Sequence, residues 1–433
     1  MSEVVEVNVR SLAFGGAGVG EVTAQSSEDR SLLGISAFVP FTIPGERVSA
    51  SINQRKKRYI EAELAEILST SADRISPKCR HFGQCGGCEL QHMSYEAQLR
   101  EKSEMVRTAM QAGRLPFAAI EALKPVRSGA PFHYRRRMML HVDSTGRVGF
   151  YRTRSRSVVG LQECPIADPA IEREISKLSE LGKAVSKNIS SIILEADEHG
   201  VVVVLKSPYD LSRTEIERLL GSAKKFFNNV VLMSAEKEVG GIGRKVLELP
   251  LPGKAGLRLQ VAAGTFSQVN WAVNQSLLET SLELTALSRG ATVCDLYAGA
   301  GNFALAFAAA GARVFAVECE PRLVSMGRQV AEKHGFDLEY LENSVEKYLA
   351  SRASKKEVDL IIADPPRSGL GPLVSQLDFG KSLLLVSCHL ASFVRDLKAL
   401  LEQGWQLETV QPFDMFAQTT YLEVVALLRR SGQ

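Results

Sequence analysis

The stretch TVCDLYAGAGNF, residues 292–303, decides the fold of the C-terminal part of this chain. It reads as an apolar strand, a turn with two glycines, and the start of a helix. Gly299 and Gly301 let the backbone turn sharply and approach a ligand closely. Glu318 ends the next strand-like run, ARVFAVE, where a carboxylate can hydrogen-bond the hydroxyls of a ribose. The turn therefore predicts a site for a cofactor that carries a ribose.

Two cofactor classes fit this turn, and a glycine-rich turn without a ligand is the third interpretation. A dinucleotide fingerprint is G-x-G-x-x-G, and the chain offers Gly299, Gly301 and Ala304, which that fingerprint tolerates. The acidic residue before the loop, Asp295, favours S-adenosylmethionine, because this cofactor has no pyrophosphate and its amino group can meet a carboxylate. We therefore expect a methyl donor rather than a nicotinamide cofactor.

Outward from this turn, short β-rich runs alternate with helical segments over residues 263–433. This alternation predicts an α/β domain with a doubly wound, Rossmann-like sheet, closed by two late strands. Residues 71–262 are rich in strands with helical segments between them, which predicts an antiparallel α+β module. Residues 1–70 read as about five short strands with glycine-rich turns, which predicts a small OB-like β-barrel. The helical run that starts at Ser94 is expected to end at Gly113.

Two strand ends in the C-terminal domain carry residues suited to catalysis. VDLIIA ends at Asp364-Pro365-Pro366-Arg367, and SLLLVS ends at Cys388. In amino-methylating enzymes an aromatic residue commonly follows Asp-Pro-Pro, so the arginine disfavours methylation of an exocyclic amine. A thiolate added to carbon 6 of uracil makes carbon 5 nucleophilic, and a carboxylate such as Glu423 can then remove the carbon 5 proton. A buried core thiol is the alternative for Cys388.

Four motifs, DLYAGAGNF, IIADPPRSG, VSC and the late MF-x-QT-x-x-x-E, together resemble the RNA uracil-5-methyltransferases. The iron–sulfur branch that acts on large-subunit (23S) rRNA is the most similar, and the first 70 residues look like its RNA-binding TRAM domain. The resemblance implies Cys388 as nucleophile and Glu423 as general base. It also implies that cofactor contacts come from Gln268, Tyr297, Asn302, Glu318, Asn343 and Asp364.

The chain departs from the family pattern beside both catalytic residues. His389-Leu390 follows the cysteine, where the family usually has Asn-Pro or Asp-Pro. Ala417 and Tyr421 precede the glutamate, where the family usually has a proline and a histidine. These departures concern rate and substrate choice more than the type of reaction.

Three of the seven cysteines, Cys79, Cys85 and Cys88, lie within ten residues, and Cys164 is a candidate fourth ligand. The spacing alone permits zinc or an iron–sulfur cluster. It does not match the Cys-x3-Cys-x2-Cys triplet of radical enzymes. The resemblance implies a [4Fe–4S] cluster held by these four cysteines. Cys294 and Cys319 flank the predicted cofactor strands and are expected in the core.

The bulk composition is that of a globular protein with two or three domains, since 45% of the 433 residues are hydrophobic and 23% are charged. We find neither a run of 18 apolar residues nor a secretory signal in MSEVVEVNVR, so we expect a cytoplasmic protein without membrane contact. The net charge is only +3, but QRKKRY (54–59) and YRRR (134–137) combine basic and aromatic residues. Such clusters suit RNA, and a solvated basic face is the alternative.

We therefore expect a monomeric S-adenosylmethionine-dependent 23S rRNA (uracil-5-)-methyltransferase that binds a single-stranded loop and splays out its uridine. The expected domains are 1–70 (TRAM-like barrel), 71–262 (iron–sulfur α+β domain) and 263–433 (methyltransferase domain). The same reaction on tRNA and an RNA-binding protein with a degenerate site remain alternatives. A redox iron–sulfur protein is a further one, but it leaves the methyl-donor loop unexplained.

Overall fold

The computed structural model describes residues 3–25, 31–351 and 357–430, which form two compact units. The first unit comprises Met1–Thr108, Tyr151–Arg156 and Phe416–Tyr421. The second unit comprises Ala109–Phe150, Ser157–Met415 and Leu422–Gln433. Each unit thus combines segments that are distant in the chain. The three consecutive domains expected from the sequence, with boundaries at 70 and 262, stay a prediction.

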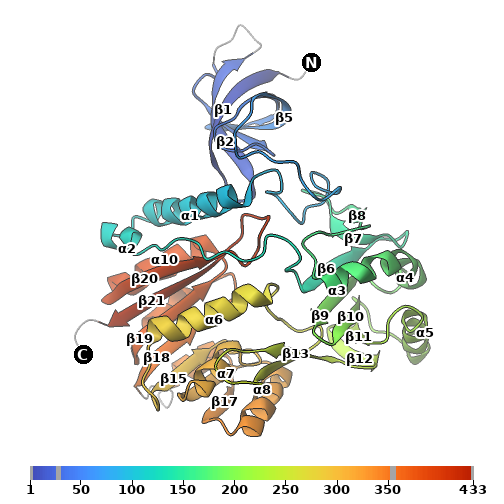
Figure 1. Ribbon diagram of the computed structural model, residues 1–433, viewed down its shortest axis with the longest axis vertical. Helices are drawn as coiled ribbons and strands as arrows, with labels where there is room; N and C mark the ends of the chain where they lie inside the picture. Colours follow the sequence, from blue (N-terminus) through green and yellow to red (C-terminus); the bar gives the residue numbers. More distant parts are fainter. Residues whose placement is uncertain (1–2, 26–30, 352–356, 431–433) are drawn as a thin grey trace. The chain divides into compact units, whose positions relative to one another are not determined.

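The first unit contains the predicted barrel, which is closed and has five strands in the order β1-β2-β3-β5-β4. It is the blue part of the chain in Figure 1. Alternate residues of β1, among them Val5, Val7 and Val9, are buried inside the barrel, as the two-residue period of a strand requires. Closure leaves no long unpaired edge. The strands are β1 (Val4–Leu12), β2 (Ala17–Gln25), β3 (Ser36–Pro40), β4 (Arg47–Arg55) and β5 (Tyr59–Ser69).

The helix after the cysteine-rich loop is α1 (Tyr95–Ala112), which ends directly before Gly113 as predicted. The Ser94 hydroxyl accepts a hydrogen bond from the Ala97 N–H at 3.4 Å and so satisfies one of the donors at the helix start. A short helix, α2 (Phe117–Glu121), follows it.

The second unit contains a mixed seven-stranded sheet in the order β12-β11-β10-β9-β6-β7-β8. The prediction of an antiparallel module is wrong for one pair of strands, because β10 and β11 are parallel. Helix α5 (Arg213–Ala223) connects these two strands, and a parallel pair requires such a crossover. The strands are β6 (Arg137–Val142), β7 (Val148–Tyr151), β8 (Val158–Gly160), β9 (Ser191–Asp197), β10 (Gly200–Ser207), β11 (Val230–Ser234) and β12 (Lys237–Ile242).

Two further helices, α3 (Pro169–Glu174) and α4 (Leu178–Val185), lie between β8 and β9 in the chain. Strands β13 (Val246–Pro250) and β14 (Arg258–Ala262) form a separate two-stranded sheet. In the chain, this hairpin precedes the helix and strands of the C-terminal sheet, which belongs to the same unit.

The C-terminal sheet has the order β17-β16-β15-β18-β19-β21-β20, and its first five strands are parallel. This confirms the doubly wound α/β prediction, with β21 inserted antiparallel between β19 and β20. The strands are β15 (Thr292–Leu296), β16 (Arg313–Glu318), β17 (Leu338–Glu342), β18 (Val358–Ala363), β19 (Gly380–Ser387), β20 (Trp405–Phe413) and β21 (Glu423–Arg430). The helices are α6 (Trp271–Thr285), α7 (Asn302–Ala309), α8 (Pro321–His334), α9 (Val345–Ala350) and α10 (Leu390–Glu402).

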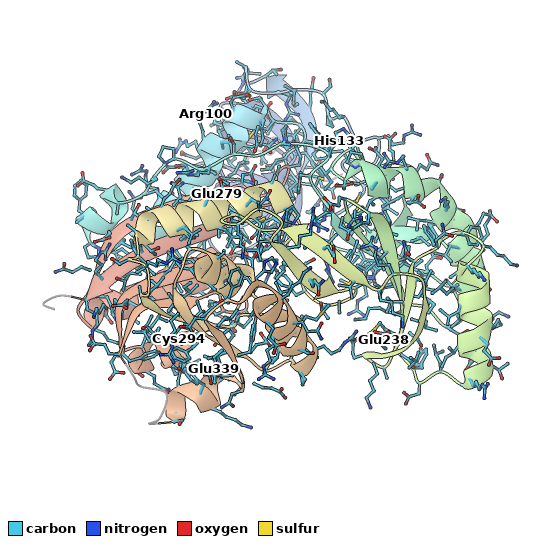
Figure 2. All side chains as sticks on the ribbon, turned by 60° about the horizontal axis from the view of Figure 1, so that its bottom comes forward. Arg100, His133, Glu238, Glu279, Cys294 and Glu339 are labelled. Atoms are coloured by element: carbon cyan, nitrogen blue, oxygen red, sulfur yellow. The ribbon has the colours of Figure 1, made fainter. Side chains whose placement is uncertain are left out.

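The two cysteines of the cofactor strands behave differently. Cys294 lies within the C-terminal sheet and is fully buried, as predicted (Figure 2). Cys319 is exposed, so its assignment to the core is wrong; it is the first residue beyond β16, where the chain leaves the sheet. Within the described ranges, no helix combines the length and the apolar character needed to cross a membrane.

Candidate active site

The turn after β15 has a constrained backbone beside open space. Tyr297, Gly299 and Gly301 all have positive φ, at 63°, 57° and 106°. Glycine adopts this region freely, whereas a tyrosine there is an outlier of the kind found at functional sites. Glu318 holds the turn, since its Oε2 accepts a hydrogen bond from the Gly299 N–H at 2.9 Å. A Cβ added at Gly299 would meet nothing within 4 Å, so a ligand can approach this backbone.

Asp295 lies just before this turn and is a buried acid whose carboxylate has few polar contacts. It is 1% exposed, and neither carboxylate oxygen has a hydrogen bond of normal geometry among the described residues. Burial raises its pKa well above the ordinary aspartate value, the charges of Asp364 and Glu318 raise it further, and the Ala304 N–H opposes them. A buried carboxyl group without a hydrogen bond of normal geometry suits a cationic ligand. The carboxylate oxygens of Asp295 can accept hydrogen bonds from the amino group of S-adenosylmethionine, so this position fits that cofactor.

Two further predicted cofactor residues, Asn302 and Asn343, adjoin this turn or its neighbouring strand, and Gln268 lies on a separate loop. The Asn343 N–H, directly after β17, donates to the carbonyl of Glu318 at 3.0 Å. Asn302 opens α7, and its side-chain amide exchanges two hydrogen bonds with Asn274 of α6, at 2.8 and 3.0 Å. Gln268 is half-buried in the loop between β14 and α6. Their roles as cofactor ligands stay predictions.

The reaction residues meet at the carboxyl edge of the C-terminal sheet. Ser387, the last residue of β19, pairs with Val424 of the antiparallel strand β21. The next pair in this register is Cys388 and Glu423. Asp364 directly follows β18, the parallel neighbour of β19. The pairing thus gathers three residues that the sequence separates by 24 and 35 positions.

The electrostatics of this edge are dominated by two acids, the buried Glu423 and the half-buried Asp364. Burial raises the pKa of Glu423 well above its usual value, and the charge of Asp364 raises it further. Burial likewise raises the pKa of Asp364. Burial, together with the charge of Glu423, raises the pKa of the Cys388 thiol, while Arg367 lowers it through its charge and a hydrogen bond, and Asp364 raises it. The arginine of the DPPR motif is therefore the group that favours a thiolate.

The turn that carries Cys388 is held by its neighbours on both sides. The Ser387 hydroxyl accepts a hydrogen bond from the His389 N–H at 3.2 Å. The His389 side chain caps α10, where its Nδ1 accepts from the Ser392 N–H at 3.3 Å. The Ser392 hydroxyl in turn donates to the carbonyl of Arg367 at 3.0 Å. His389 thus serves as a helix cap at the position where the sequence departs from the family pattern.

Asp396 of α10 was missed by the sequence analysis, although it positions the DPPR loop. It is 2% exposed, and its carboxylate accepts hydrogen bonds from the N–H groups of Leu370 and Gly371 at 2.6 and 3.1 Å. Arg395 donates to the same carboxylate at 2.7 and 2.9 Å. An acid on the otherwise apolar face of an amphipathic helix is the signal that could have revealed it.

The cysteine loop of residues 79–88 lies in the first unit and is closed by backbone hydrogen bonds. The Phe82 N–H donates to the carbonyl of Cys79 at 3.1 Å, and the Gly87 N–H donates to the sulfur of Cys85 at 3.4 Å. The three cysteines of this loop are half-buried. Cys164 is buried and belongs to the second unit. Over the described part of the chain, no group of three or more His, Cys, Asp or Glu side chains is placed to hold a metal ion, so the four-ligand set stays a prediction.

The comparisons with known proteins agree with this fold and site. Residues 94–431 match the family described as tRNA (Uracil-5-)-methyltransferase. Among curated relatives, the 23S rRNA (uracil(1939)-C(5))-methyltransferase RlmD of Shewanella woodyi is 32% identical over 406 residues, which cover 91% of each chain. The RlmD of Alkalilimnicola ehrlichii is 30% identical over 452 residues, which cover 100% of this chain and 98% of the relative.

A solved structure extends the similarity to the whole fold. The tRNA (uracil-54, C5)-methyltransferase of Pyrococcus abyssi, in complex with S-adenosyl-L-homocysteine, aligns with a TM-score of 0.73 at 22% identity and covers 98% of this chain and 100% of the other. At this identity the likeness concerns the fold. The family match and the curated relatives decide the class: this chain belongs to the tRNA (Uracil-5-)-methyltransferase family. The resemblance expected from the sequence motifs is thereby confirmed.

Proposed function

We propose that this protein transfers a methyl group to carbon 5 of a specific uridine in 23S rRNA, through a covalent adduct between Cys388 and carbon 6. The observation that carries the proposal is the register of β19 and β21, which sets Cys388 opposite Glu423, with the half-buried Asp364 directly after the neighbouring strand β18. The 23S rRNA substrate is supported by the names of the curated relatives, which align over nine tenths or more of the chain.

The side chains at this edge can divide the reaction into two steps. The Cys388 thiolate, favoured by Arg367, adds to carbon 6 of the uracil, and the electron pair moves to carbon 5. S-adenosylmethionine supplies the methyl group when it is bound. Glu423 then takes the proton from carbon 5, and the bond between sulfur and carbon 6 breaks to release the thiolate and 5-methyluridine. A raised pKa makes Glu423 a stronger base than an exposed glutamate.

We assign cofactor recognition to the turn after β15 and its neighbours. Asp295 suits the amino group, and Glu318 at the end of β16 suits the ribose, while Tyr297 and Asp364 line the same edge. Gln268, Asn302 and Asn343 complete the proposed set. Isothermal titration with S-adenosylhomocysteine would test the assignment, with Glu318→Ala expected to weaken binding on the order of tenfold or more.

We also propose that Cys79, Cys85, Cys88 and Cys164 hold a [4Fe–4S] cluster. The hydrogen bond from the Gly87 N–H to the Cys85 sulfur supports this, because such bonds to thiolate ligands are typical of cluster sites. The spacing of the four cysteines also permits zinc. Iron and sulfide analysis of anaerobically purified protein decides between them: four irons per chain are expected for the cluster, whereas zinc without sulfide would contradict it.

The RNA substrate can be held by the barrel and the exposed basic hairpin of residues 54–58 between β4 and β5. We propose that the protein acts as a monomer in the cytoplasm, on a single-stranded loop whose target uridine is splayed out. The three predicted domains, 1–70, 71–262 and 263–433, correspond in this proposal to RNA binding, the cluster and methyl transfer.

The decisive experiment is nucleoside mass spectrometry after incubation of the purified protein and S-adenosylmethionine with unmodified 23S rRNA. The appearance of 5-methyluridine is the expected result. The same product from unmodified tRNA alone would replace rRNA with tRNA as the substrate, which the Pyrococcus abyssi neighbour makes the second candidate. No product with either RNA would contradict the proposal and favour an RNA-binding protein with a degenerate site.

A further inference from the structure

The segment Phe416–Tyr421, which leads into the proposed base Glu423, belongs to the first unit rather than to the sheet that follows it. It lies in the connection between β20 and β21, outside regular secondary structure. Gln418 in its middle has a φ of 69°, which is costly for a residue other than glycine. A segment in this conformation persists when its surroundings fix it. Three elements of the first unit do so.

The first element is the residue pair that directly follows the cysteine loop. One carboxylate oxygen of Glu89 accepts hydrogen bonds from the backbone N–H and the hydroxyl of Thr420, at 2.9 and 3.0 Å. In return, the N–H groups of Glu89 and Leu90 both donate to the carbonyl of Gln418, at 2.9 and 3.0 Å. Glu89 is therefore joined to this segment through both its side chain and its backbone, and it is the next residue after Cys88.

The second element is α1. The side-chain amide of Gln98 donates to the Gln418 side-chain oxygen at 3.0 Å and accepts from the Gln418 N–H at 3.1 Å. The ammonium group of Lys102 donates to the carbonyl of Phe416 at 3.1 Å, and this lysine is 0% exposed. Burying a lysine is costly, so a buried ammonium group directed at this carbonyl marks a strongly constrained segment.

The third element is the turn between β1 and β2 of the barrel. The Gly15 N–H donates to the Thr420 hydroxyl at 3.0 Å. The ring of Phe14 lies edge-on to the ring of Tyr421, with 5.1 Å between centroids. The Thr420 hydroxyl thus accepts from the barrel and donates to Glu89, which links the barrel and the cysteine loop through one atom.

We propose that Glu89 is a positioning residue for the removal of the carbon 5 proton. Glu89 fixes the position of Thr420, three residues before Glu423. It thereby sets the position of the Glu423 carboxylate at the start of β21. Glu89, directly after the cysteine loop, and the turn between β1 and β2 both bond to Thr420, so both act on one chemical step, the removal of the carbon 5 proton that releases the methylated uridine. This inference rests on the proposed function, in which Glu423 is the base.

The proposal predicts which step slows. Loss of the Glu89 carboxylate leaves Cys388 in place, so the thiolate still adds to carbon 6 and the methyl group is still transferred. Proton removal from carbon 5 is delayed, and methylated RNA stays bonded to Cys388. Since hydrogen bonds to a charged acceptor contribute about 1.5–3 kcal/mol, decay of the adduct should slow on the order of tenfold to a hundredfold.

The test is a single-turnover reaction with the full-length protein and methyl-labelled S-adenosylmethionine, followed over time on denaturing gels. Glu89→Ala is expected to accumulate a labelled protein–RNA adduct, and Glu89→Gln, which keeps an acceptor oxygen, is expected to restore its decay in large part. Thr420→Val should accumulate the adduct as well, because it removes the hydroxyl at the centre of the link. Glu96→Ala, an exposed glutamate at the start of α1, is the matched control and should resemble the unaltered protein.

Two outcomes overturn the inference. The first is normal adduct decay in both Glu89→Ala and Thr420→Val. The second is a loss of methylation without any adduct, with both variants folded by circular dichroism, which would place Glu89 in RNA binding instead. Glu423→Gln serves as the reference: if this variant also forms no adduct while the unaltered protein makes 5-methyluridine, the assignment of the base has failed and not the positioning role alone.

Discussion

At the scale of single residues, the active edge combines one thiol with several acids in a poorly solvated place. Glu423 is 3% exposed and its pKa is raised by burial and by Asp364. The charge of Asp364 raises the pKa of Glu423, so the two carboxyl groups do not ionise independently. Such an arrangement suits a step in which a proton has to be accepted and then lost.

Replacing the nucleophile tests the covalent mechanism. Cys388→Ala should reduce 5-methyluridine formation on the order of a thousandfold or more, because carbon 5 is no longer activated. RNA binding, measured by filter retention, should stay within about twofold of the original. Glu402→Ala, which alters an exposed residue at the end of α10 in the same unit, is the control and should keep full activity. Normal turnover by Cys388→Ala would exclude the adduct.

Replacing the base separates the two chemical steps. Glu423→Gln should still transfer the methyl group but release the product slowly, since an amide does not accept the carbon 5 proton. A protein–RNA adduct that survives a denaturing gel is the expected observation. For the unaltered enzyme, single-turnover release should rise with pH through the raised pKa of Glu423, because only the ionised carboxylate acts as a base. A release rate independent of pH would contradict this role.

Asp295 connects cofactor binding to stability. Its pKa is raised in the folded protein, so the folded state keeps a proton that the unfolded chain loses above the ordinary aspartate pKa of 3.8. The free energy of unfolding therefore falls as pH rises from that value to the raised one. Asp295→Asn cannot ionise and should be more stable than the original by about 1–3 kcal/mol at neutral pH, with little difference at pH below the ordinary value.

Thermal unfolding across pH measures this effect, and titration with S-adenosylhomocysteine should show weaker binding by the same variant. Asp337→Asn, at an exposed position after α8, is the control and should change neither quantity. A variant that is destabilised at neutral pH would mean that the Asp295 carboxylate is ionised and paired in the folded protein.

At the scale of elements, α10 organises both reaction loops. Its first residues follow Cys388, and its cap reaches the carbonyl of Arg367 through Ser392. One turn further along, Asp396 holds the loop after Asp364. A Cβ added at Gly369 would lie 2.3 Å from an oxygen of Asp396, so this loop has to approach the helix closely. The helix therefore sets the spacing between the DPPR motif and the nucleophile.

The cap of α10 provides the test at this scale. His389→Ala should lower the free energy of unfolding by about 1 kcal/mol, because the Ser392 N–H loses its acceptor. His389→Asn, which introduces the residue usual in the family and a good capping side chain, should remain within a few tenths of a kcal/mol of the original, about the difference among good caps. Chemical denaturation measures both. Equal stability of the alanine variant would show that the cap contributes nothing.

At the scale of the whole molecule, the charge is distributed unevenly although the net charge is only +3. Residues 53–58, which include Lys56, Lys57 and Arg58, are all exposed at the hairpin between β4 and β5. Exposed cations on a β-barrel can neutralise RNA phosphates and release counterions.

Replacing Lys56, Lys57 and Arg58 together with alanine should weaken RNA binding and reduce its dependence on salt. If all three contact phosphates, the slope of log affinity against log salt should fall by about 2 on single-stranded RNA. Binding of S-adenosylhomocysteine should not change, since the barrel belongs to the other unit. An unchanged slope would assign RNA binding to other basic residues.

The sequence by itself determined the barrel, the helix after the cysteine loop, the doubly wound α/β sheet with the catalytic motifs at its strand ends, and the choice of a methyl donor. These follow from local periodicity and from turns such as that at Gly299 and Gly301, where neighbouring residues alone decide the backbone. The position of Cys388 at a carboxyl strand end beside Asp364 was also predictable, because carboxyl ends of parallel strands share one edge of a sheet. Glu423 was predicted at the start of the last strand, and it reaches the same edge because β21 runs antiparallel to β19.

Only the tertiary structure decided which residues face one another. Opposition of Cys388 and Glu423 depends on the register of β19 and β21, and the role of Asp396 depends on a loop 25 residues earlier in the chain. Glu89 meets Thr420 across 331 positions. Local patterns carry no information about such pairs, because the free energy that selects them comes from burial and hydrogen bonds formed after the chain has folded back on itself.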